Sequence, residues 1–131
     1  MAKFETFEDM EVWKLASRLC VDVYQATRGE AFEEDWSLRN QIRKSAVSIP
    51  SNIAEGFERR SDKEFARFLV IAKGSAGELR TQLYLARSLG YLEQELFNQL
   101  LDKARHVSSQ IANLVAHLRR SDAQESGAPD V

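Results

Sequence analysis

Two long stretches of the chain repeat apolar residues every three or four positions, and this repeat constrains the fold more than any other feature. Within residues 62–89 the repeat consists of Phe65, Leu69, Ala72, Ala76, Leu79, Leu83 and Ala86. Within residues 94–120 it consists of Phe97, Leu100, Ala104, Val107, Ile111, Leu114 and Leu118. Apolar residues at this spacing form one stripe along an α-helix. Each stretch is therefore predicted to be a helix that packs against others.

Two shorter stretches have the same spacing. Residues 7–28 carry Val12, Ala16, Leu19 and Val23, and residues 37–58 carry Leu38, Ile42, Ala46, Ile49, Ile53 and Phe57. Gly29 and Gly90 are typical of helix ends, and Ser61 followed by Glu64 is typical of a helix start. Short connections between four amphipathic helices predict an all-α, antiparallel, up-down-up-down four-helix bundle over residues 1–120. The polar residues 121–131 are predicted to form a disordered tail.

Composition narrows the class of protein further. A chain of 131 residues is long enough for one domain with one core. The sequence contains no apolar run long enough to cross a bilayer, and its first residues lack the pattern of a signal peptide. Its one cysteine, Cys20, cannot form an internal disulfide and suits a reducing compartment. We therefore expect a cytoplasmic protein with no membrane partner.

The second predicted helix contains a motif made of one proline and its polar and small neighbours: Ser48, Pro50, Asn52, Glu55 and Gly56. A proline inside a helix removes one hydrogen bond and costs about 3 kcal/mol. Small residues in the third helix, Gly74, Ser75 and Gly77, suggest close packing of another backbone. We interpret the row around Pro50 as a structural motif at a tight contact between the second and third helices.

The residues that usually carry catalysis are not arranged for it. A di-metal centre in a bundle needs Glu-x-x-His pairs, and this sequence has none. His106 and His117 are 11 residues apart, roughly 16 Å along a helix, which is too far to share one metal. The glycines near Gly74 lie in a heptad repeat and not after a strand, as a phosphate loop would. The sequence therefore predicts no metal, no cofactor and no enzymatic activity.

Positive charge gathers in the middle of the chain. Residues 37–92 hold 10 of the 18 Lys and Arg residues against 5 acidic ones, although the net charge of the chain is −2. The candidate nucleic-acid contacts are Arg39, Arg43, Lys44, Arg59, Arg60, Lys63 and Arg67. Such clusters attract phosphates. They can also pair with acidic residues of the same chain or of a neighbouring subunit, for which we consider Glu30, Glu33, Glu34 and Asp35.

The first predicted helix carries a second apolar row beside its core stripe. This row consists of Trp13, Cys20 and Tyr24, roughly 100° around the helix from the first. An apolar patch left exposed on a monomer would be unusual. We therefore predict that the row belongs to an interface between copies of the chain.

Three segments together resemble a known family: "FEDMEVWKLASRL", "QIRKSAVSIPSNIAEGFERRSDKEFARFL" and "GSAGELRTQLYLARSLGYL", within residues 7–92. They are similar to the 23S rRNA intervening-sequence proteins, a family of four-helix bundles. The resemblance implies a bacterial cytoplasmic protein that assembles into a ring-shaped homopentamer. A related protein, the accessory variability determinant of diversity-generating retroelements, is a basic pentamer that works with a reverse transcriptase and nucleic acid.

Two functions follow as hypotheses. The leading hypothesis is a non-enzymatic, homo-oligomeric interaction module whose assembled basic surface binds RNA, DNA or a nucleoprotein partner. In a ring, several copies of a modest basic patch would act together. The alternative is a protein-binding scaffold with no nucleic-acid function, in which the uneven charge serves only to pair subunits.

Overall fold

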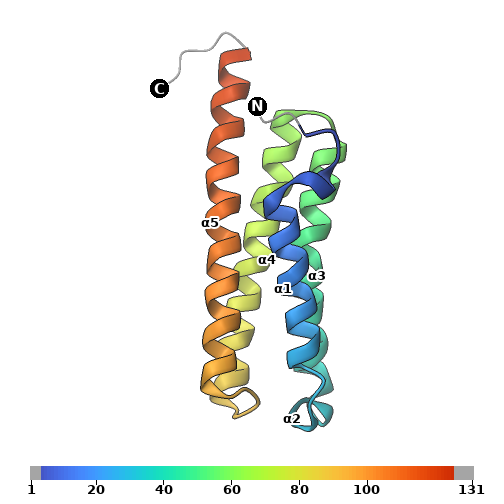
Figure 1. Ribbon diagram of the computed structural model, residues 1–131, viewed down its shortest axis with the longest axis vertical. Helices are drawn as coiled ribbons and strands as arrows, with labels where there is room; N and C mark the ends of the chain where they lie inside the picture. Colours follow the sequence, from blue (N-terminus) through green and yellow to red (C-terminus); the bar gives the residue numbers. More distant parts are fainter. Residues whose placement is uncertain (1–3, 126–131) are drawn as a thin grey trace.

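The computed structural model describes residues 4–125, and all regular structure within them is helical. The elements are η1 (Phe7–Asp9), α1 (Glu11–Ala26), α2 (Glu30–Glu33), α3 (Trp36–Glu58), α4 (Asp62–Ser88) and α5 (Gln94–Glu125). The four long helices run alternately down and up (Figure 1). The antiparallel bundle predicted from the apolar spacing is the observed fold.

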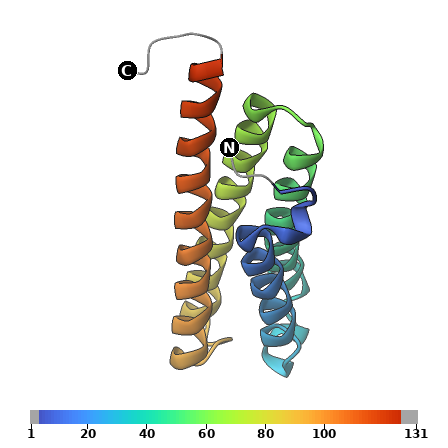
Figure 2. The same ribbon diagram turned by 45° about the horizontal axis from the view of Figure 1, so that its top comes forward.

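Each long helix packs against two others. α1 contacts α3 and α5, and α4 contacts the same two helices from the other side of the bundle. Both views show that the C-terminal end of α5 extends beyond the ends of the other helices (Figures 1 and 2). The helix does not end at residue 120 as predicted but continues to Glu125, so residues 121–125 of the predicted tail are helical. Residues 126–131 of that tail lie outside the described residues.

The apolar repeats form the core. All members of the repeat in α4 are buried, and so are those in α5 except Leu114, which packs against the core while half-buried. The stripe of α1 is also buried. The apolar stripes of the helices therefore meet in a single hydrophobic core, as the spacing predicts.

The ends of the helices differ in detail from the predicted caps. Ser61 accepts a hydrogen bond from the amide of Glu64 at 3.3 Å, which confirms it as the cap of α4. The carboxylate of Glu64 turns toward Arg67 and does not complete a capping box. Gly90 follows α4 with a positive φ of 81°, which fits its predicted role at the helix end. Arg60 has a φ of 59° where a glycine is usual, so α3 ends in a conformation that few side chains adopt.

The acidic connection between the first two long helices is more ordered than its sequence indicates. Residues 30–36 lie between the predicted first and second helices, yet they contain the helical turn α2 and a fully buried side chain, Phe32. The rings of Phe32 and Tyr91 pack edge to face, with their centroids 5.2 Å apart. The hydroxyl of Tyr91 donates to Asp35 at 2.9 Å, and this hydrogen bond raises the pKa of Tyr91. The connection before α3 is thereby attached to the connection after α4.

The close approach between α3 and α4 occurs at Gly56. A Cβ atom at this position would lie 2.6 Å from the Cβ of Phe68 and 3.1 Å from Cδ1 of Phe65. Gly74, by contrast, faces open space, and a Cβ at Gly77 would meet only the end of the Arg80 side chain at 3.9 Å. The close packing predicted at these two glycines of α4 is therefore wrong. Of the three small residues named for this contact, Ser75 is the one that is buried and hydrogen-bonded to α3.

Candidate functional site

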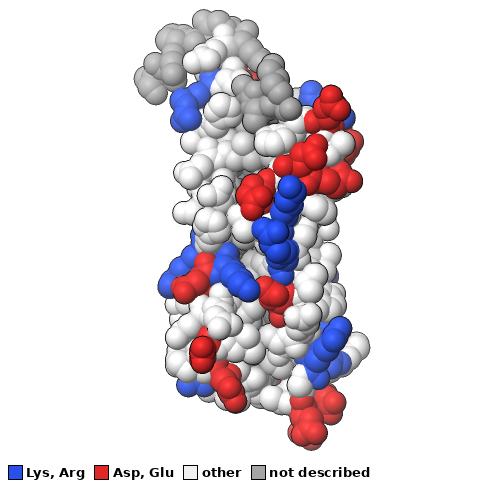
Figure 3. All heavy atoms as spheres, viewed as in Figure 1, with Lys and Arg blue, Asp and Glu red and all other residues white. Residues whose placement is uncertain are grey.

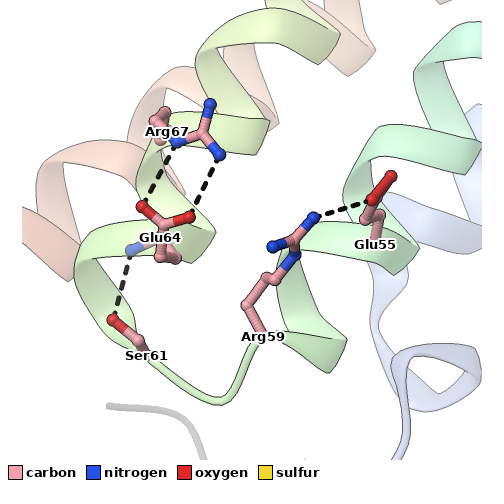
Figure 4. A network of polar contacts seen from close by, with 5 residues as sticks. All are labelled: Glu55, Arg59, Ser61, Glu64 and Arg67. Carbon is pink, nitrogen blue, oxygen red and sulfur yellow. Dashed lines mark hydrogen bonds and ion pairs between the residues drawn. The ribbon is translucent and has the colours of Figure 1, made fainter.

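The turn from α3 to α4 collects four of the predicted phosphate-binding residues: Arg59, Arg60, Lys63 and Arg67. Two of them are paired with carboxylates of their own helices (Figure 4). Arg59 Nη2 donates to Glu55 Oε2 at 3.1 Å. Arg67 donates from Nε and Nη2 to the two carboxylate oxygens of Glu64, at 3.2 and 3.0 Å. A phosphate at this turn would therefore have to compete with two fixed carboxylates.

The pairing changes the electrostatics of the turn. The hydrogen bond from Arg67 lowers the pKa of Glu64, with smaller contributions from the nearby charges of Arg67, Arg59 and Lys63. Glu64 therefore stays ionised to lower pH than an ordinary glutamate. Its negative charge cancels part of the positive field of the cluster, and the exposed position of these pairs makes each of them weak.

Aromatic rings hold the same arginines against the surface. The guanidinium carbons of Arg59 and Arg67 lie 4.8 and 4.6 Å from the centroid of the Phe68 ring. Arg60 lies over the ring of Phe57 at 5.2 Å. A cation over an aromatic face at these distances is attracted to it. The three guanidinium groups are therefore held at one end of the bundle.

The other three predicted contacts lie elsewhere on α3. Arg43 is roughly 24 Å along the helix from Arg59. Its Nε donates to Thr27 Oγ1 at 2.9 Å and its Nη2 to the carbonyl of Tyr24 at 3.3 Å, so it binds the C-terminal end of α1. Arg39 is half-buried, whereas Lys44 is exposed. The structure therefore separates the seven predicted residues into a cluster at the turn and a group along α3.

The polar row around Pro50 lies between α3 and α4, with α3 continuous through the proline. The hydroxyls of Ser48 and Ser75 are 2.9 Å apart and hydrogen-bonded. Asn52 Nδ2 donates to the carbonyl of Ser48 at 2.8 Å and to its hydroxyl at 3.0 Å. Glu55 is exposed and pairs with Arg59 instead of joining this contact. Ser48, Asn52 and Ser75 therefore connect α3 to α4 through one chain of hydrogen bonds.

Replacing Asn52 with leucine is expected to lower the free energy of unfolding by about 1–3 kcal/mol, because the carbonyl and hydroxyl of Ser48 lose a half-buried donor. Urea unfolding followed by circular dichroism measures the change. Asn40→Leu, the same substitution at an exposed position of α3, is the matched control and should change little. An Asn52→Leu variant as stable as the wild type would show that the row contributes nothing to the bundle.

The second apolar row of α1 is partly used within the chain. Trp13 is half-buried against Phe7, with ring centroids 5.2 Å apart. Cys20 is also half-buried, and burial raises the pKa of its thiol. Tyr24 is 37% exposed, and Arg43 lies over its ring at 4.5 Å. The role of this row between subunits remains a prediction.

The two histidines line different hollows between α1 and α5. His106 lies beside Leu15 and Val107, whereas His117 lies beside Met10 and Leu114. Within residues 4–125 no group of three or more His, Cys, Asp or Glu residues is placed to hold a metal ion. In the same part of the chain, no helix is both long and apolar enough to cross a membrane.

Comparison with known proteins supplies the family. The family model described as "23S rRNA-intervening sequence protein" matches residues 8–113. This chain belongs to that family. A solved member of the S23 ribosomal protein family from Bacteroides thetaiotaomicron VPI-5482, described as a protein of unknown function, has the same fold with a TM-score of 0.72. The two chains are 20% identical over 79% of this chain and 97% of the other. A search of curated proteins gave no match.

Sequence reasoning missed a second exposed apolar surface of this family member. Large apolar side chains on α4 and at the residue after it are exposed: Val70, Ile71, Leu85 and Leu89 are 43–56% exposed. Their spacing was visible in the sequence, where they lie between the core residues of the same helix. The core repeat accounted for one face of α4, so nothing drew attention to the apolar character of the opposite face.

Proposed function

We propose that this protein is a homo-oligomeric interaction module without enzymatic activity. The observation that supports it most is the apolar surface on the outside of a bundle whose core is already filled by other residues. Val21, Val70, Ile71, Leu85 and Leu89 each leave more than two-fifths of their area exposed. Exposed apolar surface that does not contribute to the core of the single chain is typical of protein interfaces. A pentameric ring in the cytoplasm is the form that the family resemblance implies.

Thermal unfolding tests this proposal. If the folded chain is stabilised by association with other copies, its melting temperature rises with protein concentration, because mass action favours the associated state. We expect a steady rise between micromolar and hundred-micromolar chain concentrations. A melting temperature that is constant over this range, together with reversible unfolding of a single chain, would contradict self-association.

Binding of RNA or DNA is a second candidate function. Its support is the turn between α3 and α4, where Arg60 and Lys63 are exposed and, among the described residues, form no ion pair. Arg59 and Arg67 would also contact phosphates only if they gave up their ion pairs with Glu55 and Glu64. Several copies of a weak site in one ring would bind one strand together. The aromatic rings at this cluster, Phe57 and Phe68, are buried beneath the guanidinium groups and cannot stack bases, so the contact would be mainly with phosphates.

The double variant Arg59→Glu with Arg60→Glu is expected to weaken binding of duplex DNA and to reduce its dependence on salt. Each lost phosphate contact lowers the slope of log affinity against log salt by about 0.9. Fluorescence anisotropy between 50 and 200 mM salt measures both quantities. The control is Lys14→Glu with Arg28→Glu, two exposed cations on the α1 side of the molecule. Equal losses in both variants would show only a general charge effect. Absence of binding by the wild type would favour the protein-binding scaffold.

A further inference from the structure

The seam where α4 packs against α5 carries five cations outside the seven predicted phosphate contacts. Lys73, Arg80 and Arg87 follow one another at intervals of seven residues on α4, so they lie on one side of that helix, about 10.5 Å apart along its axis. Arg105 and Arg119 are 14 residues apart on α5 and also share one side. We call these five residues the seam cations.

Contacts between the two helices show that both rows face this seam. Helical periodicity places Tyr84 on the same side of α4 as Arg80. The hydroxyl of Tyr84 accepts a hydrogen bond from Arg105 Nη2 of α5 at 3.2 Å. Further along, Arg119 lines the same hollow as Val70 of α4. These contacts fix an antiparallel register in which position 80 of α4 lies opposite position 108 of α5.

Acidic residues are scarce along this seam. Among residues 65–88 of α4 the one acidic residue is Glu78, which helical periodicity places on the opposite side from Arg80. Among residues 96–121 of α5 the one acidic residue is Asp102, which forms no ion pair with a described residue. The four ion pairs within the described part of the chain include none of the seam cations. Their positive charge is therefore not cancelled by a paired carboxylate.

Arg80 is the half-buried seam cation that has no partner among the described residues. Its Nε is buried without a hydrogen bond, and its Nη2 lies beside Gly77, 3.9 Å from where a Cβ atom would be. The register places it opposite Ser108, which is 7% exposed and whose hydroxyl also has no partner there. Buried polar groups without partners are uncommon in native proteins. An anion on the guanidinium group of Arg80 would supply the partner.

The face formed by α1 and α5 has a different charge pattern. Figure 3 looks onto that face, where acidic and basic side chains gather in small mixed groups. Ion pairs join Lys103 to Asp22 at 2.6 Å and Arg18 to Glu11 at 3.2 Å. A polyanion on that face would meet carboxylates beside these cations. The seam between α4 and α5 instead offers cations that no carboxylate pairs.

Tyr84 adds an aromatic surface to the seam. It is 47% exposed, and its ring packs edge to face with Phe97 of α5, with the centroids 5.2 Å apart. This contact and the hydrogen bond from Arg105 hold the ring in place. An exposed aromatic ring beside cations can stack a base of a single strand, whereas the bases of a duplex are already stacked on one another. A single strand therefore suits this surface better than a duplex.

We propose that single-stranded nucleic acid binds along the α4–α5 seam, with its phosphates on the seam cations and a base on Tyr84. This inference rests on the candidate nucleic-acid function and extends its contact beyond the turn between α3 and α4. Lys63 of that turn lines one hollow with Arg119, so the seam continues from the turn, although three acidic residues line this hollow as well. From Lys73 to Arg87 the seam extends roughly 21 Å, which is long enough for several consecutive phosphates.

Fluorescence anisotropy with labelled single-stranded DNA tests the phosphate contacts. The seam variant carries Lys73→Gln with Arg105→Gln, and the matched control carries Lys14→Gln with Arg28→Gln on the α1 side. All four residues are exposed, so the fold should be preserved, as circular dichroism will verify. The seam variant is expected to bind at least about tenfold more weakly at 50 mM salt. Its slope of log affinity against log salt should fall by about 1.4, because each lost contact with a single strand removes about 0.7. The control should keep the affinity and the slope of the wild type.

Tyr84→Leu tests the base contact. The wild type is expected to bind the single strand more tightly than a duplex of the same sequence, and this variant should lose that preference without changing the salt slope, because stacking involves no counterion. Trp36→Leu is the matched control, because Trp36 is an aromatic residue of α3 that is 63% exposed and outside the seam. It should keep the preference of the wild type.

The outcomes separate this inference from the nucleic-acid function on which it rests. A seam variant that binds like the wild type, while Arg59→Glu with Arg60→Glu weakens binding, would overturn the seam and leave the function at the turn. Equal losses in the seam variant and its control would also overturn it. A wild type that binds duplex as tightly as single strand would overturn the assignment to a single strand. A wild type that binds neither would overturn both the inference and the function.

Discussion

Replacing Gly56 with leucine is expected to lower the free energy of unfolding by about 3 kcal/mol. Even the first atom of a side chain at this position would lie 2.6 Å from the Cβ of Phe68 and 3.3 Å from the carbonyl oxygen of Phe65. Both are part of or next to the backbone of α4, so they cannot move without shifting the helix. The two helices must therefore separate, and the buried contact between α3 and α4 must open. Urea unfolding followed by circular dichroism measures the loss.

Ser51→Leu provides the control for this substitution. Ser51 is exposed on the same helix, so its replacement adds the same side chain without a steric conflict. We expect a change within about 0.5 kcal/mol there. Gly56→Ala should fall between the two, because the gain in helix propensity from alanine, about 1 kcal/mol, offsets part of the clash. A Gly56→Leu protein as stable as Ser51→Leu would show that the close approach of the helices is not needed.

Replacing Phe32 with alanine is expected to cost about 3–5 kcal/mol, the usual loss for a buried aromatic side chain. Phe32 is 1% exposed and is the one fully buried residue of the short helix α2. Its ring also contacts Tyr91, so its loss would free the connection before α3 from the connection after α4. Thermal and urea unfolding measure the effect, and hydrogen exchange should show faster exchange in residues 27–36 than in the wild type.

Tyr91→Phe separates the two parts of this contact. It keeps the ring against Phe32 but removes the hydroxyl that donates to Asp35 at 2.9 Å. The expected cost is about 1 kcal/mol, the net value of one hydrogen bond. If Phe32→Ala cost no more than Tyr91→Phe, the ring of Phe32 would not be part of the core in solution.

The core was predictable because its signal is repeated. Seven residues of α4, from Phe65 to Ala86, follow the heptad spacing without interruption, and every one of them is buried. When the repeat continues over six turns, only one rotation of the helix about its axis buries all of its members. The cap at Ser61 and the end at Gly90 were predictable for another reason, since each depends on the conformational preference of one residue.

The connection around Phe32 was not predictable in the same way. The apolar residues of this connection show no helical period among the four acidic ones, and Phe32 packs against Tyr91, which is 59 positions away in the chain. The partners of the arginines were also missed. The expected partners were the acidic residues near Glu33, but Arg59 and Arg67 pair with Glu55 and Glu64, within a turn of their own helices. Spacings of three and four residues on a helix would have indicated those pairs.

The candidate interface shows a different limit of sequence reasoning. An apolar residue on a helix is first assigned to the core, and Trp13 and Tyr24 were noticed because they lie outside the core stripe of α1. In the structure part of their surface is covered by Phe7 and Arg43. The residues that remain most exposed on a helix face, such as Leu85 and Leu89, are recognised only when the neighbours of α4 are known.

The central claim, that the chain assembles with copies of itself, is tested most directly by the mass of the wild-type protein in solution. Light scattering coupled to size exclusion should give about five times the chain mass of 14.9 kDa, unchanged over a hundredfold range of concentration. Another stable multiple would keep self-association and correct the number of subunits. A mass of one chain at every concentration would contradict the account.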